Sequence, residues 1–155
     1  MPCQKCIVNP NYHSFVKFGS LGSATLFYTA PAKTEDLNKD GTKLANITIH
    51  VKEETGNTPW IWVLDCSNMG LEHYTEVSFN LGLLDLLASS STLQEIWIVK
   101  PNLWIRGVYT FFQMISSAPI LKKTHFMDGS YLELTHEYGS KGLDGKTIRW
   151  LLKQG

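Results

Sequence analysis

Two continuous apolar runs constrain the fold of this chain more than any other feature. The first, Trp60-Ile61-Trp62-Val63-Leu64, ends at Asp65, and the second, Ile96-Trp97-Ile98-Val99, is stopped by Lys100-Pro101-Asn102. A strand with one buried face alternates apolar and polar residues, whereas a strand buried on both faces is apolar throughout. The two runs therefore predict central strands of a mostly parallel sheet that is covered on both faces.

Helical and strand patterns alternate along the rest of the chain. That alternation is typical of crossover connections between parallel strands. It predicts a three-layer α/β fold with a mixed, mostly parallel sheet flanked by helices, formed by residues 1–155 as a single domain. The other expected elements are a hairpin of strands at 14–18 and 25–29, a helix through Leu44, Ile47 and Val51 that stops at Gly56, helices over 75–88 and 103–115, a strand at 124–127, and short helices at 130–136 and 147–152.

The charge balance excludes some classes of partner. The 14 Lys and Arg residues equal the 14 Asp and Glu residues, so the formal net charge is zero. A general nucleic-acid binder carries a basic excess for phosphate contacts, so no nucleic-acid partner is expected. The sequence shows neither a signal peptide nor a membrane span, and three cysteines without a secretory context favour a cytoplasmic location.

Metal and catalytic motifs are incomplete. Cys3 and Cys6 supply half of a zinc site, and no second pair follows. The calcium-loop start of Asp36, Asn38, Asp40 and Gly41 lacks its closing carboxylate, because the twelfth position is Ile47. We therefore expect no metal, no cofactor and no enzyme activity. Asp65 stays open, since a carboxylate at the end of a buried strand either faces a ligand or caps the next turn, here at Ser67 and Asn68.

The segment 103–115 is apolar around most of its predicted helix. Trp104, Val108, Phe111 and Ile115 share one face, and Ile105, Tyr109 and Phe112 share the adjoining one. A helix that covers a core needs only one apolar stripe. The segment is therefore either a fully packed core helix or a surface for a lipid, a membrane or a protein partner.

The stretch 60–134 resembles the CRAL-TRIO lipid-binding domain, the fold of phosphatidylinositol-transfer and tocopherol-transfer proteins. The run that ends at Asp65 is similar to the hydrophobic strand of the family that ends in Asp, and Glu95 to Pro101 to its strand that ends in a Pro turn. Lys122-Lys123-Thr124-His125-Phe126-Met127 resembles the Lys-Ile strand, and 103–117 falls on the helix that gates the lipid pocket. The resemblance is to a minimal, single-domain form, which we expect to lack the helical subdomain that usually precedes this domain.

The resemblance implies a phospholipid, and phosphatidylinositol as one candidate, held in an internal pocket and transferred or presented between membranes. Lys123, with Lys122, would pair with the headgroup phosphate, although Ser91 stands where a headgroup Glu is expected. The implied protein is cytoplasmic and binds membranes transiently. The acyl chains would contact Trp62, Leu64, Trp97, Val108, Phe111, Phe112 and Ile115, and the gate would meet the membrane through Trp104, Ile105 and Tyr109.

Two other interpretations stay open. In the first, the chain is a protein-interaction module, of the kind found next to Rho GTPase-activating modules or of the STAS type, and the helix at 103–115 binds a protein partner. In the second, an α/β enzyme uses Asp65 with His73 or His125.

Overall fold

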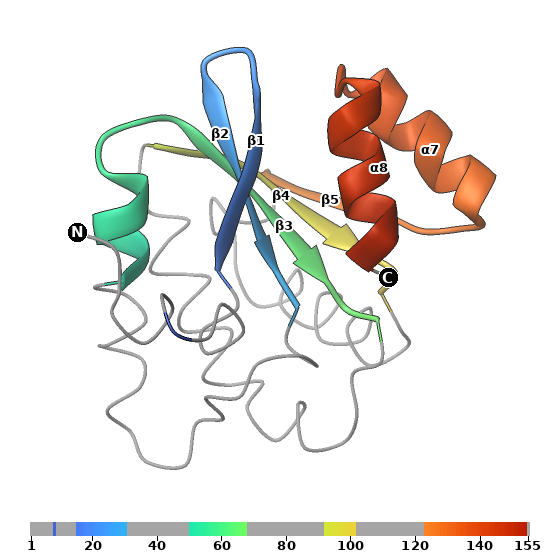
Figure 1. Cartoon of the computed structure of the whole chain (residues 1–155), viewed down its shortest axis with the longest axis horizontal. Coiled ribbons are helices and arrows are strands. Elements are labelled where there is room, and N and C mark those ends of the chain that lie inside the picture. Colours follow the sequence, from blue (N-terminus) through green and yellow to red (C-terminus); the bar gives the residue numbers. More distant parts are fainter. Residues whose placement is uncertain (1–7, 9–14, 31–49, 68–91, 102–122, 155) are drawn as a thin grey trace.

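The computed structural model describes residues 8, 15–30, 50–67, 92–101 and 123–154 (Figure 1). Within these residues, five strands form one sheet in the order β1-β2-β3-β4-β5. β1 and β2 are antiparallel, and every later neighbour is parallel. The predicted mixed, mostly parallel α/β sheet is confirmed. The strands are β1 Val16–Leu21, β2 Ala24–Thr29, β3 Trp60–Asp65, β4 Leu93–Val99 and β5 Thr124–Met127.

The expected hairpin is formed by β1 and β2. Leu21 pairs with Ala24, which leaves Gly22 and Ser23 as a two-residue connection. Gly22 has a φ of +59°, a conformation that tight hairpin turns require and that glycine adopts without steric cost. β1 begins two residues later than expected, and its register shifts between Lys17 and Gly19.

The pairing register shows which side chains of neighbouring strands lie on the same face of the sheet. Val63 pairs with Trp97, and Trp62 pairs with Ile96. Because successive side chains of a strand point to opposite faces, these two pairs lie on opposite sides of the sheet. One face, here called the helix face, packs against the helices α7 (Tyr131–Ser140) and α8 (Gly145–Gln154). It includes Leu26, Tyr28, Val63, Trp97 and Val99. The aromatic face carries Phe27, Trp60, Trp62, Leu64, Ile96 and Ile98.

Both faces are buried, as the continuous apolar runs predict. Trp97 on the helix face is 0% exposed, and Trp60 on the aromatic face is 1% exposed. The observed strands are longer than the apolar runs that predict them. β3 continues beyond 60–64 to include Asp65, and β4 begins at Leu93, before the run at 96–99.

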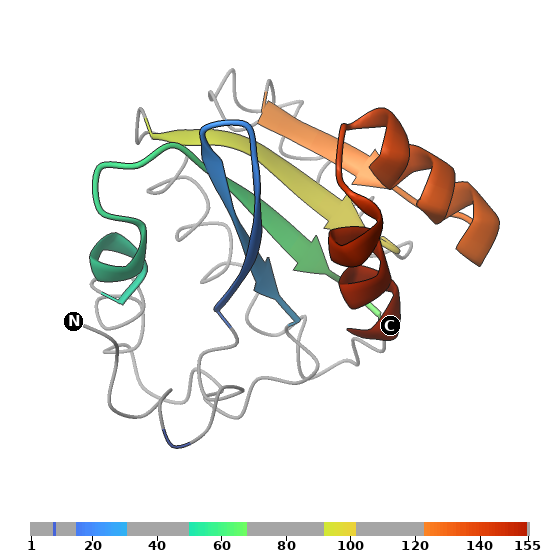
Figure 2. The same cartoon turned by 45° about the horizontal axis from the view of Figure 1, so that its top comes forward.

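Two helices cover the helix face (Figure 2). They are α7 Tyr131–Ser140 and α8 Gly145–Gln154, and both are longer than the predicted helices at 130–136 and 147–152. α7 continues past residue 136 because Leu134 and Tyr138, one turn apart, are both buried against the sheet.

Aromatic contacts fix α8 on the hairpin. The ring of Trp150 stacks on Phe18 with a centroid distance of 4.8 Å and an interplanar angle of 5°. The same ring meets Tyr28 edge-on at 5.3 Å. Leu151, on the next position of α8, is buried in the helix-face core. These contacts join segments far apart in the sequence.

The helix expected before Gly56 is present at residues 50–55, and the backbone N–H of Gly56 donates to the carbonyl of Lys52. The helices predicted over 75–88 and 103–115 lie outside the described residues, as do Cys3, Cys6 and the loop from Asp36 to Gly41. Within the described part, no helix has the length and apolarity to cross a bilayer. No group of three or more metal-ligating side chains is found there either.

The start of α7 provides a stability prediction. The Ser130 hydroxyl accepts from the Glu133 backbone N–H at 3.3 Å, and the Glu133 carboxylate accepts from the Ser130 backbone N–H at 3.4 Å, which is a capping box. Ser130→Ala is expected to lower the free energy of unfolding by about 1 kcal/mol. Urea unfolding followed by circular dichroism measures it. Ser140→Ala at the other end of α7 is the control, and an equal loss in both variants would contradict a capping role.

Candidate functional site

Asp65 is the last residue of the central strand β3 and is 4% exposed. One carboxylate oxygen, Oδ2, accepts from the Tyr28 hydroxyl at 2.6 Å. The other, Oδ1, accepts from the backbone N–H of Ser67 at 2.9 Å and from its hydroxyl. Asp65 therefore caps the turn through Ser67, which is one of the two expected roles. The partner Tyr28 belongs to the neighbouring strand and is not predicted by the sequence.

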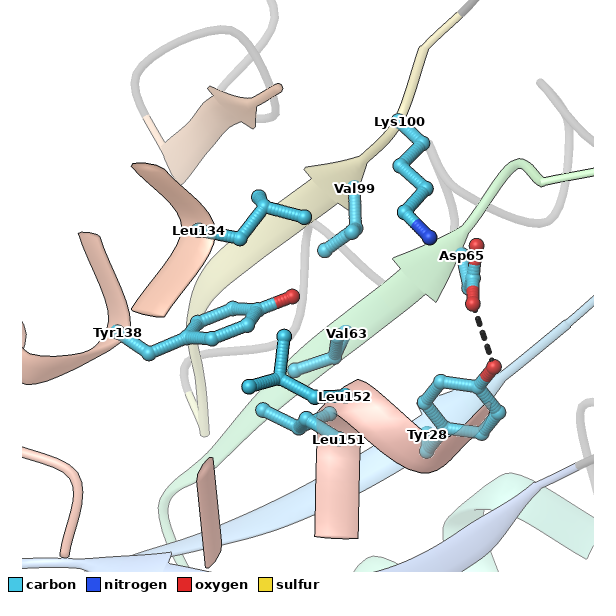
Figure 3. A pocket seen from close by; sticks show the side chains of 9 residues that line it. All are labelled: Tyr28, Val63, Asp65, Val99, Lys100, Leu134, Tyr138, Leu151 and Leu152. Carbon is cyan, nitrogen blue, oxygen red and sulfur yellow. Dashed lines mark hydrogen bonds between the residues drawn. The ribbon is translucent and has the colours of Figure 1, made fainter. Parts of the chain in front are cut away.

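Asp65 also lines a pocket (Figure 3), and its other expected role, facing a ligand, stays a prediction. The hollow measures about 270 Å³ with its open mouth included. Its enclosed part has room for about one water molecule. The pocket lies where β3 and β4 end, and α7 and α8 form its outer wall. Its lining consists of Tyr28, Val63, Asp65, Val99, Lys100, Leu134, Tyr138, Leu151 and Leu152.

Burial and the charge of Asp65 alter the acidity of three neighbours. Loss of solvation first, and then the hydrogen bond and negative charge of Asp65, raise the pKa of Tyr28 well above its usual value. Burial and the same charge raise the pKa of Tyr138 in the same direction. Burial, with a smaller contribution from Asp65, raises the pKa of the Cys66 thiol to about 12. All three groups therefore keep their protons at neutral pH, and the tyrosine hydroxyls act as hydrogen-bond donors.

Lys100 follows β4 directly and has an unusual backbone conformation. Its φ is +53°, in the left-handed region that non-glycine residues rarely adopt. The residue before a proline normally prefers an extended backbone, and Pro101 follows here. The backbone N–H of Lys100 donates to the carbonyl of Met127 at 2.8 Å, which holds the turn. Figure 3 shows the side chain extending from the end of β4 toward Asp65.

On the aromatic face, rings pack closely around Phe15. This ring stacks on Phe27 with a centroid distance of 4.6 Å and an interplanar angle of 8°. It meets Trp60 and Trp62 edge-on at 5.8 and 6.1 Å. The indole N–H of Trp62 donates to the Thr29 hydroxyl at 2.7 Å. The result is a buried cluster of aromatic rings on the side of the sheet opposite α7 and α8.

Trp62, Leu64 and Trp97, expected to line one lipid pocket, do not share one face of the sheet. Trp62 and Leu64 lie on the aromatic face, whereas Trp97 pairs with Val63 and is buried beneath α7 on the helix face. The ammonium of Lys141, just after α7, lies 5.8 Å from the centroid of the Trp97 ring. Trp97 therefore belongs to the contact between the sheet and α7.

Lys123 is half-buried directly before β5. Since β3 and β5 run in the same direction, Lys123 and Asp65 lie at opposite ends of the parallel strands. The other expected headgroup, pocket and gate residues lie outside the described residues; these are Ser91, Trp104, Ile105, Val108, Tyr109, Phe111, Phe112, Ile115 and Lys122.

The structure does not pair Asp65 with His125. His125 lies on β5, β4 separates it from β3, and its Nε2 is 2.8 Å from the carboxylate of Glu95. Lys141 also contacts Glu95, at 3.5 Å. His73, the other histidine considered for an enzyme, lies outside the described residues.

Sequence reasoning missed Tyr28, Lys100 and Tyr138 as pocket residues. In the sequence, Tyr28 is only one member of an aromatic strand, and its bond to Asp65 depends on the parallel pairing of β2 and β3. Tyr138 carries a usable signal, since it lies four residues after Leu134 on the buried stripe of α7. Lys100 carries a weaker one, a charged residue between a buried strand and a proline.

A comparison with family models agrees with this arrangement. Residues 26–147 match the model described as a divergent CRAL/TRIO domain, which spans β2 to the first turn of α8. A search of curated proteins found no match. The match confirms the resemblance predicted from the sequence and indicates a fold of the lipid-binding type. The chain therefore belongs to the family of divergent CRAL/TRIO domains.

Proposed function

We propose that this chain binds a phospholipid in an internal apolar pocket and transfers or presents it between membranes. The acyl chains lie against the aromatic face, and the phosphate pairs with Lys123, together with Lys122. Phosphatidylinositol is one candidate cargo. The proposal involves no bond cleavage and no cofactor.

The single observation that carries this proposal is the contrast between the two faces of the sheet. On the helix face, Leu134, Tyr138 and Leu151 are buried against the strands, and the enclosed space holds about one water molecule. An acyl chain does not fit there. On the aromatic face, Phe27, Trp60 and Trp62 are also buried, but neither α7 nor α8 covers them.

An unpaired donor on the aromatic face also supports the proposal. Within the described part of the chain, the indole N–H of Trp60 is buried and has no hydrogen-bond acceptor. A buried donor without a partner is unfavourable, by about 1–3 kcal/mol. An ester carbonyl of a phospholipid supplies such an acceptor, whereas a purely aliphatic ligand does not.

Membrane exchange follows from burial of apolar surface. Apolar side chains of the segment 103–115 gain about 25 cal/mol per Å² when they leave water for lipid. The same side chains gain a comparable free energy by closing over a bound acyl chain in solution. We propose that Trp104, Ile105 and Tyr109 make the transient membrane contact, so that each environment favours one of two states.

Native mass spectrometry with lipid analysis of a solvent extract tests the proposal. The purified protein is expected to carry a phospholipid, or to take one up from phosphatidylcholine–phosphatidylinositol vesicles. Leu64→Asn places a polar group on the aromatic face and is expected to weaken lipid binding about tenfold or more, because a buried leucine contributes about 1.5–3 kcal/mol. Leu152→Asn is the matched control, since both leucines are half-buried and Leu152 lies on α8.

For the headgroup contact, Lys123→Ala is compared with Lys153→Ala, which removes an exposed lysine of α8. Only the first is expected to reduce lipid retention. A protein that stays free of lipid after incubation with vesicles would refute the proposal. The segment 103–115 would then be tested as the binding face for a protein partner.

A further inference from the structure

Charge is separated between the two helices that cover the helix face. α7 contains acidic residues and neither lysine nor arginine, whereas α8 contains basic residues and no acidic one. All of these side chains are exposed; they are Glu133 and Glu137 on α7, and Lys146, Arg149 and Lys153 on α8. The chain as a whole has a formal net charge of zero. It therefore presents one acidic and one basic helix side by side (Figure 2).

The basic side chains of α8 point away from the sheet. A helix turns by about 100° per residue, so Lys146, Arg149 and Lys153 fall within about 60° of one another. Thr147 and Leu151, which are buried, lie on the opposite side of the helix. The three cations therefore form a basic row that faces solvent along about two turns of α8.

The two helices do not neutralise each other. Among the described residues, no ion pair joins an acidic side chain of α7 to a basic side chain of α8. Asp144, just before α8, accepts from the backbone N–H of Thr147 at 2.7 Å and lies near Lys146. Arg149 and Lys153 form no ion pair with any described residue. Charge of both signs is therefore available to a partner.

Apolar side chains accompany these charges. Tyr131 and Leu132, at the start of α7, are 66% and 78% exposed. On α8, Ile148 and Leu152 are half-buried, and Leu152 lines the same small pocket as Leu134 of α7. The layer formed by the two helices thus combines apolar side chains with acidic and basic groups. Apolar residues surrounded by polar ones are the usual composition of a protein–protein interface.

We propose that the layer of α7 and α8 is the interface for a second copy of this chain. A two-fold axis relates the copies, so that α7 of each copy lies on α8 of the other. The acidic residues of one copy then meet the basic row of its partner, and the same contact forms twice. Leu132 and Leu152 become buried between the helices.

A second copy fits this surface better than an anionic membrane does. An anionic bilayer attracts the basic row of α8 but repels the carboxylates of the adjacent α7. A second copy offers both signs of charge in the same arrangement, and its zero net charge adds no long-range repulsion. The interface lies on the opposite side of the sheet from the aromatic face. It therefore does not depend on the proposed lipid binding.

Sedimentation equilibrium of the purified chain, at concentrations from about 5 to 500 µM, tests the association. At about 50 mM NaCl, the average mass is expected to rise with concentration from that of one chain toward that of two. At about 500 mM NaCl the association is expected to weaken, because salt screens exposed charges. A single-chain mass at every concentration would overturn the proposal, and a dimer indifferent to salt would contradict the role of the charged residues.

Charge reversal locates the interface. Glu137→Lys and Arg149→Glu are each expected to raise the dissociation constant at least about tenfold, because each places like charges opposite one another twice. Lys52→Glu is the control. Lys52 is exposed on the helix at 50–55, which Figures 1 and 2 show at the other end of the sheet from α7 and α8. The control is expected to associate as the unchanged protein does.

Mixing the two reversed variants separates a specific contact from a folding defect. An equimolar mixture of Glu137→Lys and Arg149→Glu is expected to regain the association of the unchanged protein. In the mixed dimer, the two reversed charges attract each other, and the second contact keeps its original pair. If neither variant weakened association, or if the mixture failed to regain it, α7 would not lie on α8 of the second copy and the proposed interface would be refuted.

Discussion

Replacing Trp97 with alanine is expected to lower the free energy of unfolding by about 3–5 kcal/mol. Its side chain is 0% exposed and packs with Leu134 and Tyr138 of α7 in the helix-face core. Removing the indole leaves a cavity between β4 and α7, and Lys141 loses the ring beneath its ammonium group. Small domains are stable by only about 5–15 kcal/mol, so this loss is a large share of the total.

Two further variants separate the causes of this loss. Trp97→Phe is expected to cost less than alanine, because the indole N–H is buried without an acceptor among the described residues and phenylalanine keeps most of the packing. Leu132→Ala is the control, since Leu132 is 78% exposed and surface substitutions usually change stability by about 0.5 kcal/mol or less. Urea unfolding of the three variants gives the comparison. A loss for Trp97→Ala as small as that for Leu132→Ala would contradict the described packing of the sheet against α7.

Stability is expected to fall steeply at alkaline pH. Burial raises the pKa of Cys66 from 9.0 to about 12 and also raises the pKa of Tyr28 and of Tyr138 above their usual 10.0. The unfolded chain therefore releases these protons at a lower pH than the folded protein does. The stabilisation is complete below pH 9 and is lost as the pH rises, by at most about 1.4 kcal/mol per pH unit for each group.

The free energy of unfolding, measured in urea from pH 7 to pH 11, tests this dependence. Cys66→Ala is expected to flatten the curve from about pH 9, and Tyr138→Phe from about pH 10. Tyr131→Phe, at an exposed position of the same helix, is expected to leave the slope unchanged. If Tyr138→Phe and the unchanged protein gave identical slopes, Tyr138 would not be the titrating group.

The sheet could be predicted from the sequence because a strand buried on both faces is apolar at every position. Runs as apolar as those at 60–64 and 96–99 are typical of strands that are covered on both sides. The same continuous apolarity does not show which side chains lie on the same face of the sheet. In a strand that is apolar throughout, no alternation shows which side chains share a side, and the pairing register decides it. Here the register shifts between Trp60 and Ile61. As a result, Trp97 pairs with Val63 and lies on the other face of the sheet from Trp62.

The pocket could be predicted only in part. The position of Asp65 at the end of a buried strand predicts either a ligand-facing carboxylate or a cap; the structure shows the cap, and Asp65 also lines a small pocket. Its partners come from β2, α7 and α8, and nothing local in the sequence records a contact between Tyr28 and a residue 37 positions away. The left-handed φ of Lys100 is also set by a distant group, the carbonyl of Met127 on β5.

The strand order described above also bears on how the chain reaches this structure. Each strand pairs with the strand that precedes it in the sequence, so the sheet can grow in chain order from the hairpin of β1 and β2. The hairpin needs only a two-residue turn and can close within about 1–10 µs. Each parallel addition must first close a long connection, which slows the step. Docking of Trp150 on Phe18 spans almost the whole described chain. We therefore expect the helix-face core to be completed late in folding, with the hairpin already in place.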